Sequence, residues 1–88
     1  MKRIHVIIQG VVQGIGFRHY ICTKANLLGI KGWVRNLDND KVEAVFESSK
    51  DKIKQILEYC IKGHYPAKVK DIKIMEEEFK SEKDFRII

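Results

Sequence analysis

Residues 10–18, "GVVQGIGFR", place three glycines just before an arginine, a combination that could bind a phosphate group. A glycine-rich loop between a strand and a helix can turn successive backbone N–H groups toward one point and form an anion-binding nest. The first turn of the helix adds unpaired N–H donors and the positive end of the helix dipole. Arg18 falls in that turn, where a cation disfavours the helix unless an anion is bound, and its guanidinium matches two phosphate oxygens. The predicted phosphate cradle consists of Arg18 and the backbone of Gln13, Gly14, Ile15, Gly16, Phe17 and Arg18.

The same stretch has a simpler interpretation, in which the loop is a tight turn and Arg18 is a solvated side chain. Other phosphate motifs are absent from the sequence, because no Gly-Lys-Ser/Thr follows the glycines and a dinucleotide fingerprint would need a further glycine. The cradle also contains no Cys or Ser that could form a phosphoenzyme. An anion-binding loop and a simple tight turn therefore both stay open at this point.

Asn36 is the second candidate residue of a functional site. Asparagine is depleted in strands, and yet Asn36 lies at the end of a predicted strand. Its position has the same parity as Val34, which directs it toward the helix layer and the start of the first helix. In the alternative interpretation, Asn36 simply opens the turn "NLDNDK", a role that asparagine often has.

Hydrophobic periodicity predicts the elements that must position these residues. Ser48 or Ser49 is expected to cap the second helix, and Gly29 and Gly63 are expected to end the two helices. The segment "DFRII" is a short final strand or a tail. Strands are predicted over residues 3–9, 30–37, 41–48 and 67–75, and helices over residues 17–28 and 50–62.

Each predicted element has a face that should be buried. A change of parity between Val69 and Ile72 predicts a bulge in the fourth strand. On the other face of the sheet, Arg35 is expected to lie opposite Glu43. The predicted buried residues are Ile21, Ala25 and Leu28 in the first helix, Val42, Ala44 and Phe46 in the third strand, and Ile53, Ile56, Leu57, Cys60 and Ile61 in the second helix. An apolar strip on the uncovered face is expected from Ile7, Trp33 and Val45.

The order βαββαβ, with a possible short fifth strand, predicts an α+β fold: a two-layer ferredoxin-like sandwich in which two helices cover one face of an antiparallel sheet. In that topology the first two strands run parallel with the third between them. Their carboxyl ends therefore lie on the same edge of the sheet, about 9–10 Å apart. The cradle follows one of these ends and Asn36 lies at the other, so the fold is expected to bring them together.

Composition limits the class of protein. A chain of 88 residues is expected to form one domain, residues 1–88. The net charge of +5 comes mostly from scattered lysines, which is more typical of a solvated surface than of a nucleic-acid site. No apolar run is long enough to span a membrane. Cys22 and Cys60 are expected to be reduced thiols of a cytoplasmic protein, and His19 with Cys22 provides too few ligands for a metal site.

Together these motifs resemble the acylphosphatase family over essentially the whole chain. "GVVQGIGFR" at 10–18 is similar to the family's G-x-V-Q-G-V-G-F-R, with Ile15 for the usual valine, and "LGIKGWVRNL" at 28–37 is similar to L-G-x-x-G-W-V-R-N. The sequence departs from the family at Asp38 and Asp40, where proline and glycine are common, and at "GHYPAKV", which replaces G-P-P-x-A-x-V.

The resemblance implies metal-independent hydrolysis of acyl phosphates, such as acetyl phosphate, carbamoyl phosphate or 1,3-bisphosphoglycerate, to a carboxylate and inorganic phosphate. It also implies that Arg18 and the loop amides hold the phosphoryl oxygens and that Asn36 positions the attacking water. No cofactor or metal is then expected, and the substrate's own phosphate accepts the water's proton. Because a carboxylate is a good leaving group, positioning and charge stabilisation can supply most of the rate.

Two alternatives keep the same fold. The first is a non-catalytic module that binds acyl or carbamoyl phosphate, as in hydrogenase-maturation proteins, and it would use the same residues. The second is a nucleic-acid binder that uses the open sheet face, although that face has Trp33 and lacks a dense aromatic array. The expected partners are therefore a small acyl phosphate and the product phosphate, with no nucleic acid and no membrane, and the chain is expected to be a monomer.

Overall fold

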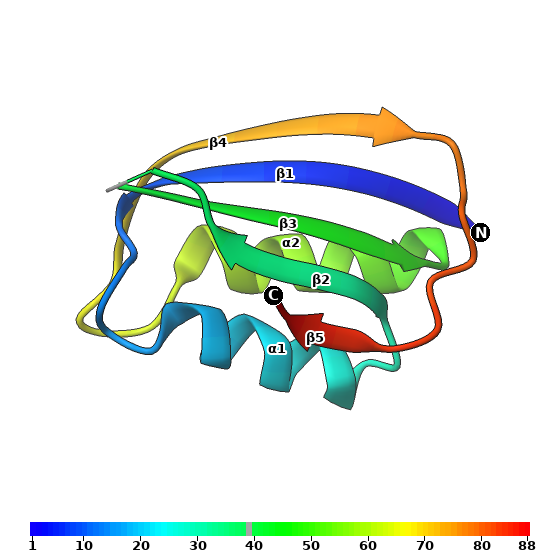
Figure 1. Ribbon diagram of the computed structural model, residues 1–88, viewed down its shortest axis with the longest axis horizontal. Coiled ribbons are helices and arrows are strands. Elements are labelled where there is room, and N and C mark those ends of the chain that lie inside the picture. The colour runs from blue at the N-terminus through cyan, green and yellow to red at the C-terminus, as the bar shows by residue number, and fades with distance from the viewer. Residues whose placement is uncertain (39) are drawn as a thin grey trace.

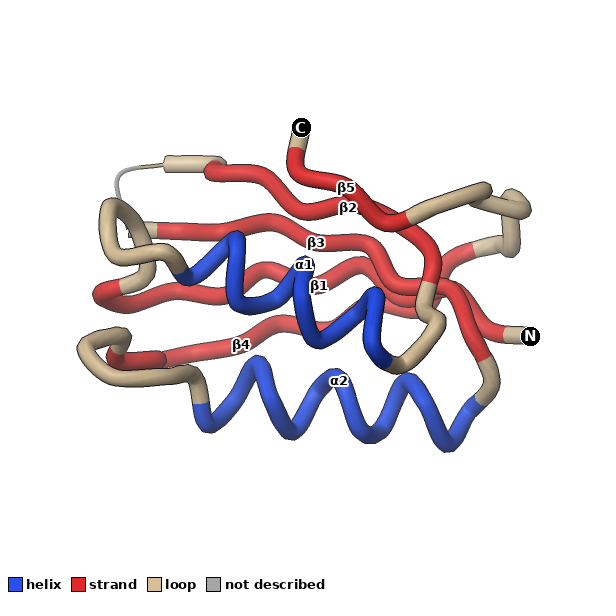
Figure 2. Tube along the Cα trace, turned by 90° about the horizontal axis from the view of Figure 1, so that it is seen from below, coloured by secondary structure: helices blue, strands red, loops and turns tan. Residues whose placement is uncertain are grey.

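The structure, a computed structural model, describes residues 1–38 and 40–88. Asn39, which belongs to the predicted turn "NLDNDK", lies outside the described residues. The chain forms a two-layer sandwich in which both helices cover one face of a sheet (Figures 1 and 2). In chain order the elements are β1 (Lys2–Val11), α1 (Phe17–Leu27), β2 (Lys31–Asn36), β3 (Lys41–Ser48), α2 (Lys50–Lys62), β4 (Lys68–Glu77) and β5 (Phe85–Ile87).

The sheet order is β4-β1-β3-β2-β5, which confirms the ferredoxin-like fold. β1 and β2 both pair antiparallel with β3, so they run in the same direction with β3 between them, as the sequence predicted. The expectation of an antiparallel sheet needs one correction, because β5 pairs parallel with β2. The segment after β4 returns along the end of the sheet before β5 begins, which gives the last strand the direction of β2 and makes the sheet mixed (Figure 1).

The core lies between the sheet and the two helices. Ser49 caps α2 by accepting a hydrogen bond from the backbone N–H of Lys52, and Gly63 ends it. Leu28 and Leu57 are partly buried against the core. The prediction that Ile61 is buried was wrong, because this residue is exposed in the last turn of α2. The buried residues include Phe17, Ile21 and Ala25 of α1, Val42, Ala44 and Phe46 of β3, and Ile53, Ile56 and Cys60 of α2.

Gly10 serves the sheet, because β1 and β4 approach closely beside it. A side chain there would place its Cβ 2.0 Å from the carbonyl oxygen of Lys68. The β1–β4 register shifts between Gln9 and Gly10, which confirms the bulge predicted from Val69 and Ile72. The first glycine of the motif therefore allows two strands to meet, and only the later glycines belong to the loop before α1.

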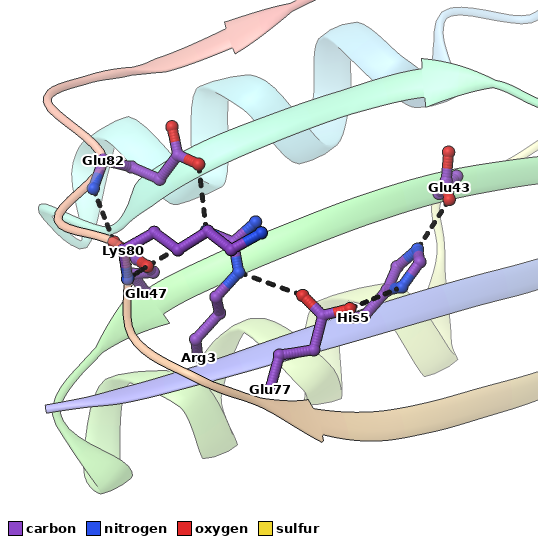
Figure 3. Close-up of polar contacts among 7 residues, drawn as sticks. All are labelled: Arg3, His5, Glu43, Glu47, Glu77, Lys80 and Glu82. Atoms are coloured by element: carbon purple, nitrogen blue, oxygen red, sulfur yellow. Dashed lines mark hydrogen bonds and ion pairs between the residues drawn. The ribbon is translucent and has the colours of Figure 1, made fainter.

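The uncovered face of the sheet holds a network of charged side chains (Figure 3). Arg3 donates to Glu47 at 3.0 Å, Glu77 at 3.0 Å and Glu82 at 2.9 Å. His5 lies between Glu77 at 3.1 Å and Glu43 at 2.6 Å. Arg35 reaches Glu43 at 2.5 Å, which confirms their predicted cross-strand contact. The expected apolar strip is interrupted by these charges, and Val45 does not contribute to it because only 1% of it is exposed.

Glu47 also fixes the segment that leads into β5. Its carboxylate accepts hydrogen bonds from the backbone N–H groups of Lys80, at 2.7 Å, and Glu82, at 2.6 Å. Burial would raise the pKa of Glu47, but these N–H groups and Arg3 outweigh it and lower the pKa. The ionised carboxylate thus joins β1, β3 and the chain before β5 into one unit.

Candidate active site

The loop between β1 and α1 has the backbone conformation that its glycines allow. Gly14 has φ of 75° and Gly16 has φ of 79°, both in the left-handed region that favours glycine. Gly16 is the N-cap of α1, and within the described part of the chain no side chain caps this helix. The first turn has no acidic residue, so no carboxylate of that turn offsets the positive end of the helix dipole.

A cavity of about 130 Å³ lies at the start of α1. Of the predicted cradle, the structure places Gly14, Gly16, Phe17 and Arg18 in its wall. Ile15 is partly buried and packs against the core, so it anchors the loop. The complete lining is Val12, Gly14, Gly16, Phe17, Arg18, His19 and Ile87.

Gln13 uses its side chain rather than only its backbone. Its Nε2 donates to the carbonyl oxygen of Lys41 at 2.8 Å and also to the carbonyl oxygen of Asp38. These two carbonyls belong to the β2–β3 hairpin, which begins directly after Asn36. Gln13 therefore ties the cradle loop to the hairpin that carries the second candidate residue.

Phe17 holds the start of α1 against the core. It is 1% exposed and its ring stacks on those of Tyr20, at 6.2 Å between centroids, and His64, at 6.4 Å. Tyr20 and His64 stack on each other at 4.5 Å. Because this aromatic cluster fixes the first turn, the neighbouring Arg18 starts from a well-defined backbone position.

Asn36 is the last residue of β2, where it pairs with Val42, and it is exposed. β2 ends on the side of the molecule where β1 runs into the loop before α1 (Figure 1). The topology thus puts Asn36 on the same sheet edge as the cradle. Among the described residues, Asn36, Gln13 and Ile15 do not line the cavity itself.

Three lining residues were not predicted from the sequence: Val12, His19 and Ile87. Ile87 has the parity of the buried Phe85, so it faces α1 from β5. The alternation of Phe85 and Ile87 is visible in "DFRII". Predicting that Ile87 lines the cavity would also have required knowing that β5 pairs with β2 beside α1. The parallel pairing was the missing information.

In the described part of the chain, the thiols and the metal-ligating side chains do not form a second catalytic arrangement. Burial raises the pKa of the Cys22 and Cys60 thiols, so neither has the character of an activated nucleophile. Among residues 1–38 and 40–88, no three His, Cys, Asp or Glu side chains are grouped as a metal site requires.

No helix among the described residues is long and apolar enough to cross a membrane. A cavity of about 170 Å³ on the outer side of α2 is lined by Gln55, Glu58, Tyr59 and Lys62.

Comparisons with known proteins identify the family of the chain. The acylphosphatase family model matches residues 4–87. An acylphosphatase of Syntrophobacter fumaroxidans is 46% identical over 92% of this chain and 84% of its own. The crystal structure of acylphosphatase from Bacillus subtilis superposes with a TM-score of 0.96 at 30% identity, covering 100% of this chain and 99% of that one.

A third similarity is to part of a larger protein. Full-length HypF, in a phosphate- and nucleotide-bound form, matches 99% of this chain with a TM-score of 0.87 at 26% identity, but only 12% of HypF is covered. The fold is that of a small ferredoxin-like sandwich with a cavity at the start of α1. The chain belongs to the acylphosphatase family, whose function is the hydrolysis of acyl phosphates.

Proposed function

We propose that residues 1–88 form a single acylphosphatase domain in which Arg18 and Asn36 carry out the hydrolysis of carboxyl-phosphate bonds. The observation that supports this is the cavity at the uncapped start of α1, where the glycine backbone and Arg18 meet. The N–H groups of the loop and Arg18 bind the phosphoryl oxygens. The guanidinium of Arg18 carries a positive charge and the N–H groups carry partial positive charges. Both therefore stabilise the negative charge of the phosphoryl group during its transfer.

In the proposed reaction, a water molecule held by the Asn36 side chain attacks phosphorus in line with the leaving carboxylate. A new P–O bond forms to the water oxygen and the bond between phosphorus and the acyl oxygen breaks. The electron pair of that bond leaves with the carboxylate, and the water's proton passes to a phosphoryl oxygen. Little acid catalysis is needed, so the site works by positioning and charge stabilisation.

Turnover of benzoyl phosphate in the presence of EDTA and ¹⁸O-labelled water tests the proposal. We expect benzoate and inorganic phosphate as products, with the label in phosphate because water attacks phosphorus. Label in benzoate would contradict the mechanism, since it would mean attack at the carbonyl carbon. Loss of all turnover in EDTA would contradict metal independence.

A binding module for acyl or carbamoyl phosphate is the second candidate, and the likeness to a segment of HypF favours it. A module would bind phosphate through the same Arg18 and cradle but release intact substrate. Calorimetric titration with inorganic phosphate, run beside the turnover assay, separates the two. Binding without any turnover would replace the enzyme by the module.

We further propose that the chain acts as a monomer in the cytoplasm. Two free thiols, Cys22 and Cys60, suit a reducing compartment. The uncovered sheet face is crossed by ion pairs rather than by a continuous apolar surface, which does not favour self-association. Sedimentation equilibrium and cell fractionation test these two points, and a dimer mass or a secreted protein would contradict them.

A further inference from the structure

One residue in the wall of the cavity, Ile87, comes from β5, which neither sequence motif at 10–18 and 28–37 includes. Ile87 is paired with Val34 of β2 and faces the helix layer with the parity of Phe85. It lines the cavity together with Arg18 and His19, and 39% of it is exposed. A substrate whose phosphoryl group occupies the cradle therefore has an aliphatic side chain beside it.

The chemistry of the lining is uneven. Among the described residues that line the cavity, Arg18 is the only side chain with a permanent charge, and the phosphoryl group uses it. Val12, Phe17 and Ile87 provide the apolar atoms, and of these only Ile87 is substantially exposed because Val12 and Phe17 are each 1% exposed. A second anionic group would find no further fixed cation here, whereas an apolar acyl group would remove Ile87 from water.

The position of Ile87 is fixed before substrate arrives. Gly32 donates its backbone N–H to the carbonyl of Asp84 at 2.8 Å, and Ile88 donates to Val34 at 3.0 Å, so both ends of β5 are held on β2. Glu47 holds the preceding segment through the N–H groups of Lys80 and Glu82. A preorganised wall costs little ordering on binding, so its contact contributes to affinity.

We propose that Ile87 is a specificity residue that contacts the acyl group and makes this site favour bulky apolar acyl phosphates over acetyl phosphate. This inference rests on the proposed function, because it requires the phosphoryl group to lie on the cradle. The phosphoryl end is the same in every substrate and is held by Arg18 and the loop. The acyl group differs from one substrate to another, and Ile87 is the exposed apolar side chain that contacts it.

The test compares kcat/KM for benzoyl phosphate and acetyl phosphate in wild type, Ile87→Ala and Ile87→Thr. Removing the apolar contact is expected to lower kcat/KM for benzoyl phosphate about tenfold and that for acetyl phosphate less than about twofold. Ile87→Thr keeps a β-branched side chain in the strand, and circular dichroism confirms that both variants fold. Ile74→Ala is the matched control, since Ile74 is 47% exposed on β4 at the other edge of the sheet, and it should change neither value.

Equal losses for the two substrates, or no loss for either, would overturn the role of Ile87 while leaving the proposed function intact. Wild-type protein that hydrolyses neither substrate would instead overturn the proposed function, and the inference would fall with it. A wild-type preference for acetyl phosphate would also contradict the inference. The three results are distinguishable within one set of assays.

Discussion

At the scale of single residues, the site places a cation where a helix does not favour one. Arg18 lies in the first turn of α1, next to the positive end of the helix dipole, and no acidic residue in that turn offsets it. Gly16, as N-cap, offers no side-chain acceptor to the first N–H groups. Helix stability alone does not account for these choices, whereas the proposed phosphoryl group would satisfy both the N–H groups and the guanidinium.

Asn36 is expected to act on the water rather than on the phosphoryl group. Asn36→Ala should lower kcat for benzoyl phosphate about 10²–10³-fold, because the water loses its positioning group. Competitive inhibition by inorganic phosphate should stay within about twofold of wild type. Asn36→Asp should also be slow, since its negative charge repels the phosphoryl oxygens.

Weakened phosphate inhibition in Asn36→Ala, with kcat unchanged, would contradict this assignment. It would instead make Asn36 a binding residue. Because Asn36 is exposed and ends a strand, its replacement by Ala should leave the unfolding midpoint close to that of wild type. A stability measurement on the same sample therefore separates loss of function from loss of fold.

At the scale of elements, a buried ion pair contacts the segment that leads into β5. The side chains of Arg3 and Glu47 are 5% and 1% exposed and lie 3.0 Å apart. Burial lowers the pKa of Arg3, but its hydrogen bonds to Glu82, Glu77 and Glu47 outweigh that effect and raise it overall. The pair joins β1 and β3 to the segment before β5, and β5 in turn carries Ile87 to the cavity.

Glu47→Gln should destabilise the fold by about 3 kcal/mol, because Arg3 loses a buried countercharge and the amide presents N–H to backbone donors. Urea denaturation at neutral pH measures this change. The control is Glu76→Gln, which removes the exposed Lys2–Glu76 pair and should change stability by less than about 0.5 kcal/mol. Equal effects of the two substitutions would contradict the role given to Glu47.

The helices and strands were predictable where a local sequence pattern was sufficient to indicate them. The Ile21 and Ala25 stripe, the Ser49 cap and the Val69–Ile72 bulge follow from local patterns, and the structure confirms them. The prediction that Ile61 is buried was wrong because apolar character alone does not bury the last turn of a helix. The Arg3–Glu47 pair and the parallel pairing of β5 join residues far apart in the chain, so no local pattern contained them.

The candidate site was only partly predictable for the same reason. Residues 14–18 are contiguous, so the local sequence was enough to predict that Gly14, Gly16 and Arg18 lie together, and the structure has all three in the wall of one cavity. Ile87 comes from the other end of the chain, and the link from Gln13 to the carbonyl of Lys41 crosses between two loops. Both features depend on the tertiary fold. The roles of Arg18 and Asn36 stay predictions.

At the scale of the whole molecule, one face of the sheet packs on the helices and the other is an ionic surface. The pKa of Glu43 would rise through burial, but Arg35 and His5 lower it, and Arg3 with other groups lowers that of Glu77. Together with Glu47, these carboxylates bind protons more weakly in the folded chain than in the unfolded chain. Their contribution to stability is therefore present above the unfolded pKa of about 4.3 and is lost as pH falls below it.

The free energy of unfolding should consequently decrease on acidification from about pH 5 to pH 3. Urea midpoints across this range measure it. Glu47→Gln, although less stable at neutral pH, should show a shallower decrease because one depressed carboxylate is missing. A slope as steep as that of wild type would contradict the assignment of acid sensitivity to Glu47.

Turnover of benzoyl phosphate by Arg18→Ala shows whether the cavity at the start of α1 is the active site. Arg86→Ala is the matched control, because Arg86 lies on β5, is bonded to Asp84 and does not line the cavity in the described residues. We expect kcat/KM to fall about 10²–10³-fold in Arg18→Ala, with phosphate binding lost, and to change less than about twofold in Arg86→Ala. Full turnover in Arg18→Ala would contradict this expectation, since the cavity at the start of α1 would then not be the active site.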